Sequence, residues 1–220
     1  MVRLPAPRWQ PQENGDGMKR VIRDVRAHEL DAVLAMNNAA GAGILPIDRE
    51  RLEHHWHHAT YFRVAEVDGQ LTGFLIALAP DADYDSPNFL WFRDRYPDFI
   101  YIDRIVVAGD HRGEGLGRVF YADVQSFAEV RSPRLACEVF VNAGNDLATI
   151  FHRSFGFREV GQQVLQRSGL RASYLVKDLC SFPWIQETYL AAGKPGLPDV
   201  EWLRARAMPA LAPAQRATGT

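Results

Sequence analysis

The stretch VAGDHRGEGLGR, residues 107–118, decides how the rest of the chain is interpreted. It joins the apolar run Phe99–Val107 to a segment, ending near Val130, in which apolar residues recur at helical spacing. Its three alternating glycines let the backbone approach a ligand closely, and the unpaired N–H groups at the start of a helix attract anions. Arg112 and Arg118 could add charge-assisted hydrogen bonds. The turn is therefore suited to a diphosphate.

Two familiar nucleotide-binding patterns do not fit this turn. The dinucleotide fingerprint G-x-G-x-x-G fails because Phe120 stands where its last glycine belongs. A P-loop fails because no Gly-Lys-Ser/Thr follows the glycines. An ordinary strand–helix connection could also carry such a turn, so the turn alone leaves phosphate binding and a structural role open.

Outward from the turn, the hydrophobic pattern alternates between strand and helix periods. The runs Tyr61–Val67 and Leu71–Ala79 flank Asp68-Gly69, a dipeptide typical of tight hairpin turns. Residues 80–98 form an aromatic and charged insertion too long for an ordinary hairpin loop. Further strands are expected at Lys19–Asp24, Phe99–Val107, Leu135–Val141, Arg158–Gln166 and Ala172–Leu179, and helices at His28–Ala39, from Asp48 to His58, up to Val130, at Asn145–Phe155, and in pieces at Ile185–Ala191 and Val200–Ala207.

These elements predict the α/β (α+β) class, with a mixed central sheet of about six or seven strands flanked by helices. We expect residues 1–17 to form a flexible tail, 18–180 the folded domain, and 181–220 an extension that is partly helical or disordered.

Composition narrows the class of function. The chain has 220 residues, 47% of them hydrophobic, with Lys+Arg 25 against Asp+Glu 27 and a formal net charge of -2. This balance gives no overall attraction to nucleic acid or anionic lipid. The two cysteines, Cys137 and Cys180, indicate no disulfide framework, and no apolar run is long enough for a membrane span or a secretory leader. A cytoplasmic protein is expected.

A second pattern follows in residues 145–157, NDLATIFHRSFGF. Asn145, Ala148 and His152 are separated by three and four residues, which places them on one stripe of a helix. One stripe can face one ligand. Asn145 could equally cap the helix, and both roles are compatible.

Together the two patterns resemble motifs A and B of the GNAT acetyltransferases. Arg112, Gly115 and Gly117 match motif A, which reads Arg or Gln, two residues, Gly, one residue, then Gly or Ala. The segment 145–157 resembles motif B, with its Asn, Ala and Gly-Phe in register. The resemblance covers about Met18–Leu179, and the helical start, the hairpin and the last two strands agree with the family's fold.

The resemblance implies acetyl-CoA as cosubstrate, with no prosthetic group and no required metal. The pyrophosphate would lie on the glycine loop, Asn145 would meet the pantetheine arm, and Ala148 would leave room for it. The residues assigned to cofactor binding in this way are Ile105, Val106, Val107, Arg112, Gly113, Glu114, Gly115, Leu116, Gly117, Arg118, Asn145, Ala148 and His152.

His152 stands where many family members have a tyrosine that acts as the general acid. A smaller subgroup of predicted acetyltransferases has Phe-His here, as this chain does at Phe151-His152. An imidazole can protonate the departing thiolate, so we hypothesise that His152 is the acid. A histidine that borders the apolar face of its helix and bonds locally is the competing interpretation.

A base is also needed, because an alkyl amine with a pKa of about 10 is mostly protonated at neutral pH. We expect Asp103 to share a strand face with Ile105 and Val107 and to act as the base, with Glu138 on the next strand as the alternative. An ion pair at Asp103 and a water relay remain open. The family resemblance places the oxyanion donor at a backbone N–H near Val106-Val107.

The insertion supplies candidates for the acceptor site. Tyr84, Asn88, Trp91 and Arg95 offer aromatic and polar groups, and neighbouring carboxylates suit a cationic amine. A structural lid is an equally good interpretation of residues 80–98.

Two other signals are set aside. The histidines of the run His54–His58 could present imidazoles to a metal, but the segment lacks a zincin pattern and fits a polar helical face, so no metal is expected. Cys137 is expected to be packed and not catalytic, since no fixed Cys-His spacing accompanies it.

The leading hypothesis is an enzyme that acetylates a primary amine of a small molecule by direct attack, with neither nucleic acid nor membrane as partner and a homodimer left open. A noncatalytic acyl-CoA sensor that uses residues 180–220 for a partner is one alternative. A protein N-acetyltransferase is the other.

Overall fold

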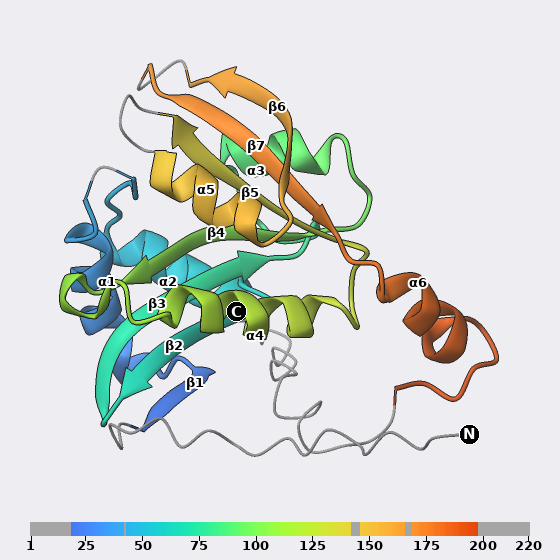
Figure 1. Cartoon of the computed structure of the whole chain (residues 1–220), viewed down its shortest axis with the longest axis horizontal. Helices are drawn as coiled ribbons and strands as arrows, with labels where there is room; N and C mark the ends of the chain where they lie inside the picture. Colours follow the sequence, from blue (N-terminus) through green and yellow to red (C-terminus); the bar gives the residue numbers. More distant parts are fainter. Residues whose placement is uncertain (1–18, 42, 142–145, 166–168, 198–220) are drawn as a thin grey trace, which may run out of the picture.

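The computed structural model describes residues 19–41, 43–141, 146–165 and 169–197 (Figure 1). Seven strands form a sheet in the order β1-β2-β3-β4-β5-β7-β6. The strands are β1 (Arg20–Asp24), β2 (Tyr61–Val67), β3 (Gln70–Leu78), β4 (Ile100–Val107), β5 (Arg134–Val141), β6 (Arg158–Val164) and β7 (Arg171–Asp178). The helices are η1 (Ala27–Glu29), α1 (Leu30–Asn38), α2 (Arg49–His58), α3 (Pro87–Arg93), η2 (Gly109–His111), α4 (Leu116–Ala128), α5 (Asp146–Ser154), α6 (Phe182–Ile185) and η3 (Gln186–Leu190).

The sheet is mixed, as predicted, because β4 and β5 are parallel and every other neighbouring pair is antiparallel. Apolar side chains of α1, α2 and α3 form a core on one face, and those of α4 and α5 form a second core on the other. Figure 1 shows α4 and α5 lying in front of the strands, with α1 and α2 behind. The two cores hold the sheet between two helical layers.

Short sequence motifs correctly predicted the hairpin of β2 and β3 and the start of α2. Asp68 and Gly69 have φ angles of 49° and 84°, so the Asp-Gly turn closes the hairpin as predicted. The Asp48 side chain accepts a hydrogen bond of 2.8 Å from the Arg51 N–H and caps α2. The expected helix at Ile185–Ala191 is confirmed by η3, whereas residues 1–17 and the expected piece at Val200–Ala207 lie outside the described residues.

The insertion at residues 80–98 is not a loop throughout, because α3 forms within it. Pro87 begins this helix, where its missing N–H costs nothing. Phe89 and Phe92, three residues apart, are fully buried in the core beside α1 and α2. The expectation of a loop was wrong for residues 87–93, since burial of these two rings stabilises a helix.

A divergence of the two parallel strands creates space in the middle of the sheet. Within the described chain, β4 pairs with β5 only from Ile100 to Ile102, opposite Leu135 to Cys137. Beyond these residues the strands separate, and the cavities described below open between and beside them.

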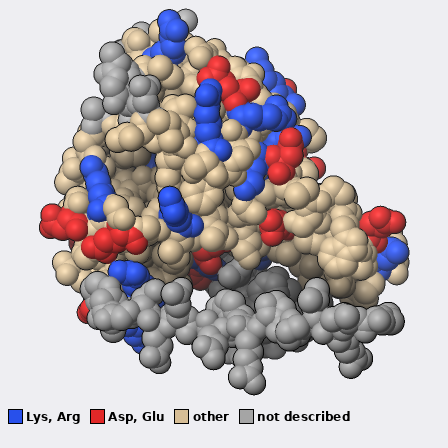
Figure 2. All heavy atoms as spheres, in the orientation of Figure 1, with Lys and Arg blue, Asp and Glu red and all other residues tan. Residues whose placement is uncertain are grey.

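The distribution of charged side chains on the surface agrees with the nearly equal numbers of basic and acidic residues. Figure 2 shows basic and acidic side chains interspersed over one face of the molecule. Every helix in the described part of the chain is too short or too polar to cross a membrane.

Candidate active site

The glycine loop after β4 forms an open anion-binding cradle. Gly113 and Gly115 have φ angles of 88° and 85°, a left-handed conformation that strains other residues. Gly115 is the N-cap of α4, so the first N–H groups of that helix face the loop without helical partners. A cavity of about 590 Å³ lies against them. Residues 112–118, predicted for cofactor binding, all line this cavity, and His111 lines it as well.

Some charged side chains of the loop are held by hydrogen bonds within the protein. The Arg112 guanidinium donates to the carbonyl oxygens of Val107 (3.3 Å) and Ala40 (3.0 Å), so it joins the loop to the end of α1. His111 Nδ1 lies 3.2 Å from a Glu114 carboxylate oxygen. Arg118 also lines the cavity, and the cradle therefore has two arginines beside one carboxylate.

A second cavity, of about 300 Å³, occupies the divergence of β4 and β5. It shares Ile105 and Phe151 with the first cavity, so the two spaces adjoin. Ala148 and His152 of α5 line this second space, as the helical stripe predicted. Asn145, the third member of that stripe, lies outside the described residues.

Two of the predicted cofactor residues on β4 face opposite ways. Val107 lines the loop cavity, whereas the Val106 side chain is buried in the core beside α1 and α2. Only the backbone of Val106 is thus available to a ligand between the strands. The oxyanion donor at this point stays a prediction.

Glu138 presents a partly buried carboxylate to the second cavity. The Tyr101 hydroxyl donates to its Oε2 at 2.5 Å, and the Asn88 amide donates to its Oε1 at 3.0 Å. Burial raises the pKa of Glu138 to about 7, helped by the nearby charge of Asp103 and opposed by these hydrogen bonds. A carboxyl group with this pKa can take up and release a proton near neutral pH.

Asp103 lines the same cavity but is held in a different way. Its Oδ1 accepts from the Tyr84 hydroxyl at 2.6 Å, and its Oδ2 accepts from Arg104 Nε at 2.7 Å. His55 Nε2 lies 3.6 Å from Oδ2, beyond hydrogen-bond distance. Burial by itself would raise the pKa of Asp103, yet the Arg104 charge and these bonds outweigh it and lower the pKa. Asp103 is therefore a stable carboxylate.

The expectation that Asp103 shares a face with Ile105 and Val107 was wrong. The register between β3 and β4 shifts at this point, because Ile76 pairs with Arg104 and Ala77 pairs with Ile102. Asp103 is the extra residue of a β-bulge, which changes the alternation of side chains along the strand.

The neighbours of the Asp103 side chain lie on the other side of the sheet from Ile105 and Val107. Tyr84 and His55 belong to the layer of α1, α2 and α3, whereas Ile105 and Val107 pack against the opposite core.

His152 is buried among aromatic rings, with 7% of its surface exposed. Its Nδ1 lies 2.7 Å from the Tyr121 hydroxyl and 3.6 Å from Cys137 Sγ. Burial lowers the pKa of His152 to about 4, so the imidazole is neutral at pH 7. Cys137 is buried in the core, and burial raises the pKa of its thiol, which agrees with a packed and unreactive residue.

Only half of the acceptor candidates reach the cavity. Tyr84 and Asn88 line it, whereas Trp91 and Arg95 are not among its described lining residues. Trp91 stacks on Tyr174 at a ring distance of 4.4 Å, and the Arg95 guanidinium lies 4.1 Å above the Trp91 ring. Trp91 instead attaches α3 to β7 of the sheet, and Arg95 covers the Trp91 ring.

Several residues around the site escaped sequence reasoning. Tyr101 and Tyr121 bond to Glu138 and His152 from other elements, and no spacing in the sequence links them to those partners. Arg104 is next to Asp103 on β4, and the sequence left an ion pair at Asp103 open without naming this arginine.

A glycine cradle at the start of a helix, adjoining a carboxylate cavity between diverging parallel strands, is the arrangement expected of an acetyltransferase with the GNAT fold. The chain belongs to the acetyltransferase (GNAT) family, whose sequence profile matches residues 30–157. The search for relatives among curated proteins found no match.

Solved structures agree with the family. A ribosomal-protein-alanine N-acetyltransferase from Brucella melitensis is 28% identical, with a TM-score of 0.55 over 72% of this chain and 99% of that one. Naa50 of Arabidopsis thaliana, solved with the bisubstrate analogue CoA-Ac-MVNAL, is 13% identical, with a TM-score of 0.56 over 72% and 98%. The second likeness is one of fold.

Proposed function

We propose that this protein is an N-acetyltransferase that moves the acetyl group of acetyl-CoA to the primary amine of a small molecule. The cradle at residues 111–118 supports the cofactor, because its N–H groups and arginines suit a pyrophosphate. The cavity of about 300 Å³ supports a small acceptor, and its two carboxylates, Asp103 and Glu138, suit a cationic amine.

The observation that carries the mechanism is the partly buried carboxyl group of Glu138, which lines the cavity and bonds to Tyr101 and Asn88. We assign it, and not Asp103, as the general base, because a pKa of about 7 lets it accept a proton from the ammonium group. Asp103 is already bonded to Tyr84 and Arg104, and its lowered pKa makes it a weaker base. Its negative charge attracts the acceptor and raises the pKa of Glu138.

The deprotonated amine attacks the thioester carbonyl carbon, and the carbon–sulfur bond breaks to release a thiolate. We assign His152 to protonation of that sulfur. Tyr121 engages Nδ1, which leaves Nε2 for the cavity. Because burial lowers its pKa to about 4, the His152 imidazole is neutral at pH 7. It therefore first takes up the proton that the attacking nitrogen releases and then delivers that proton to the sulfur, whose developing negative charge raises the pKa of His152 during this step.

The substitution Glu138→Gln tests this assignment. We expect kcat/KM to fall by about 100-fold or more, and the wild-type limb with a pKa of about 7, along which activity rises with pH, to disappear. A pH–rate profile in single-turnover format provides the measurement. Glu50→Gln, at an exposed position of α2, is the matched control and should keep both values. A Glu138→Gln enzyme that keeps the acidic limb would contradict the role of Glu138.

The acceptor is identified by acetyl-CoA turnover with polyamines, amino acids, aminoglycosides and peptides, using mass detection of the products. Acetylation of small amines at rates well above peptides is the expected result. The 28% identity to a ribosomal-protein-alanine N-acetyltransferase favours a second candidate, the amino terminus of a protein. Faster acetylation of peptides would establish that candidate. Cofactor binding without turnover on any acceptor would instead indicate a noncatalytic sensor.

A further inference from the structure

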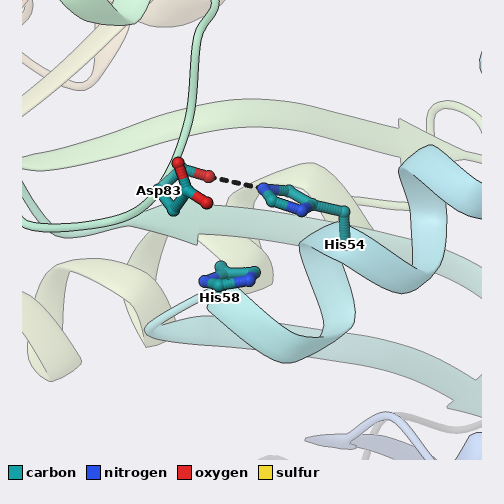
Figure 3. Close-up of side chains that lie close together, drawn as sticks. All are labelled: His54, His58 and Asp83. Atoms are coloured by element: carbon teal, nitrogen blue, oxygen red, sulfur yellow. Dashed lines mark hydrogen bonds between the residues drawn. The ribbon is translucent and has the colours of Figure 1, made fainter.

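Two histidines of α2 meet an aspartate from a distant segment. His54 and His58 are one helical turn apart, and Asp83 belongs to the connection between β3 and α3. Figure 3 shows the His54 ring directed at Asp83, with His58 on the next turn of the same helix. One possible ligand atom from each residue lies within 4.8 Å of the others.

The three groups have the chemistry of a transition-metal site. Two imidazole nitrogens and one carboxylate oxygen suit Zn²⁺, Co²⁺ or Ni²⁺, whereas Mg²⁺ and Ca²⁺ prefer oxygen ligands throughout. Metal–nitrogen and metal–oxygen bonds of about 2 Å require donor atoms a little over 3 Å apart. Separations within 4.8 Å therefore need only small side-chain adjustments to reach that geometry.

The site is partly organised before any metal binds. The rings of His54 and His58 stack with centroids 4.2 Å apart. His54 Nε2 lies 2.5 Å from the Asp83 carbonyl oxygen. Arg51, on the same helix, pairs with Asp85 at 2.7 Å, which holds the segment carrying Asp83 against α2. Fewer groups must lose freedom when a ligand binds to such an arrangement.

We propose that His54, His58 and Asp83 bind one divalent transition-metal ion of the Zn²⁺ class. The sequence predicted no metal because the histidine run lacks a zincin pattern and fits a polar helical face. The fold adds Asp83, from a distant segment, to two of these histidines. The ion would fasten α2 to the residue before Tyr84, which lines the acceptor cavity and bonds to Asp103. The site would therefore stabilise one wall of that cavity, and it does not depend on the acetyl-transfer proposal.

Calorimetric titration of the full chain with Zn²⁺, after removal of any purification tag and treatment with a chelator, tests the site. We expect one strongly bound ion per chain. His58→Ala and Asp83→Asn should each weaken binding by more than about 10-fold, because even groups one step removed from a metal contribute 10- to 100-fold. His57→Ala, an exposed histidine of the same helix, is the control and should leave affinity unchanged. Equal affinity in wild type and His58→Ala, or absence of Zn²⁺ binding, would overturn the proposal.

Thermal unfolding separates metal binding from damage to the fold. Without metal, the variants should melt at temperatures close to that of wild type, since His58 and Asp83 are exposed. Zn²⁺ should raise the Tm of wild type and His57→Ala but not that of His58→Ala. Hydrogen exchange should slow in residues 81–86 of wild type when Zn²⁺ is added. Protection elsewhere but not there would refute the fastening of this segment.

Discussion

Glu138 and Asp103 line one cavity, yet their environments move their pKa values in opposite directions. Glu138 has only neutral hydrogen-bond donors, Tyr101 and Asn88, so burial prevails and its pKa rises to about 7. Asp103 has the Arg104 guanidinium as a donor, so its pKa falls. A pair of carboxyl groups with separated pKa values is a frequent arrangement for acid–base chemistry. The sequence identified both residues and placed Asp103 first as the base, whereas we propose Glu138.

His152 and Tyr121 form a buried hydrogen-bonded pair whose contribution to stability can be measured. Tyr121→Phe leaves His152 Nδ1 without its 2.7 Å partner, which should lower the free energy of unfolding by about 1–3 kcal/mol. Adding His152→Leu removes the unpaired nitrogen, so the double variant should recover part of that loss. Urea unfolding measures both. Tyr189→Phe, at a half-buried position, is the control. If the double variant is less stable by the sum of the single losses, the pair is not coupled.

At the scale of elements, the loop between β4 and α4 forms the proposed cofactor cradle, and the divergence of β4 from β5 opens the proposed acceptor cavity. The bulge at Asp103 moves one carboxylate to the layer of α1, α2 and α3. Glycine spacing predicted the loop between β4 and α4, because the conformation of this loop depends on residues 113–117 themselves. The bulge depends on pairing with β3, a partner far away in sequence, and alternation along β4 did not predict it.

Gly117, in the first turn of α4, lies close to α5, so its substitution should affect the proposed cofactor site. A Cβ at this position would lie 3.2 Å from the Phe151 ring of α5, which both cavities share. Gly117→Ala should therefore displace Phe151 and cost about 1 kcal/mol or more, a several-fold increase in the Kd for CoA by calorimetry. Gly109→Ala is the matched control, because a Cβ there would meet nothing within 4 Å and its φ angle is ordinary. An unchanged Kd in Gly117→Ala would show that Phe151 does not shape the cofactor site.

For the whole molecule, buried neutral histidines couple folding to pH. Burial lowers the pKa values of His55 and His152 from 6.5 to about 4, so the unfolded chain binds more protons at these two sites between those pH values. Their contribution to stability is complete above pH 6.5 and is lost as the pH falls toward 4. Glu138, with a pKa raised from 4.5 to about 7, acts in the opposite sense but is one group against two.

We therefore expect the free energy of unfolding to decrease between pH 7 and pH 5. Urea unfolding across this range measures it. His55→Leu should flatten the dependence, whereas His57→Leu, at an exposed position, should not. The comparison uses the slope with pH, so a change in absolute stability does not obscure it. An identical slope in wild type and His55→Leu would exclude His55 as a source.

The sequence by itself determined the order of strands and helices, the Asp68-Gly69 hairpin and the glycine loop of the cofactor site. Each depends on residues close together in the chain, through backbone conformation or the period of apolar residues. It also indicated the family, since the two motifs are local patterns in a fixed order. The helix within residues 80–98 was missed, because burial of Phe89 and Phe92 against other elements stabilises it.

Only the tertiary structure decided which groups around the cavities are paired, charged or reachable. Tyr84 bonds to Asp103, Tyr121 bonds to His152, and Asp83 meets the histidines of α2 across the fold. A side chain's pKa and its ligands depend on neighbours within a few ångströms, and folding brings those neighbours from distant parts of the chain. Residue types therefore predicted the chemistry available, and the packing of the sheet and its helices determined where that chemistry can occur.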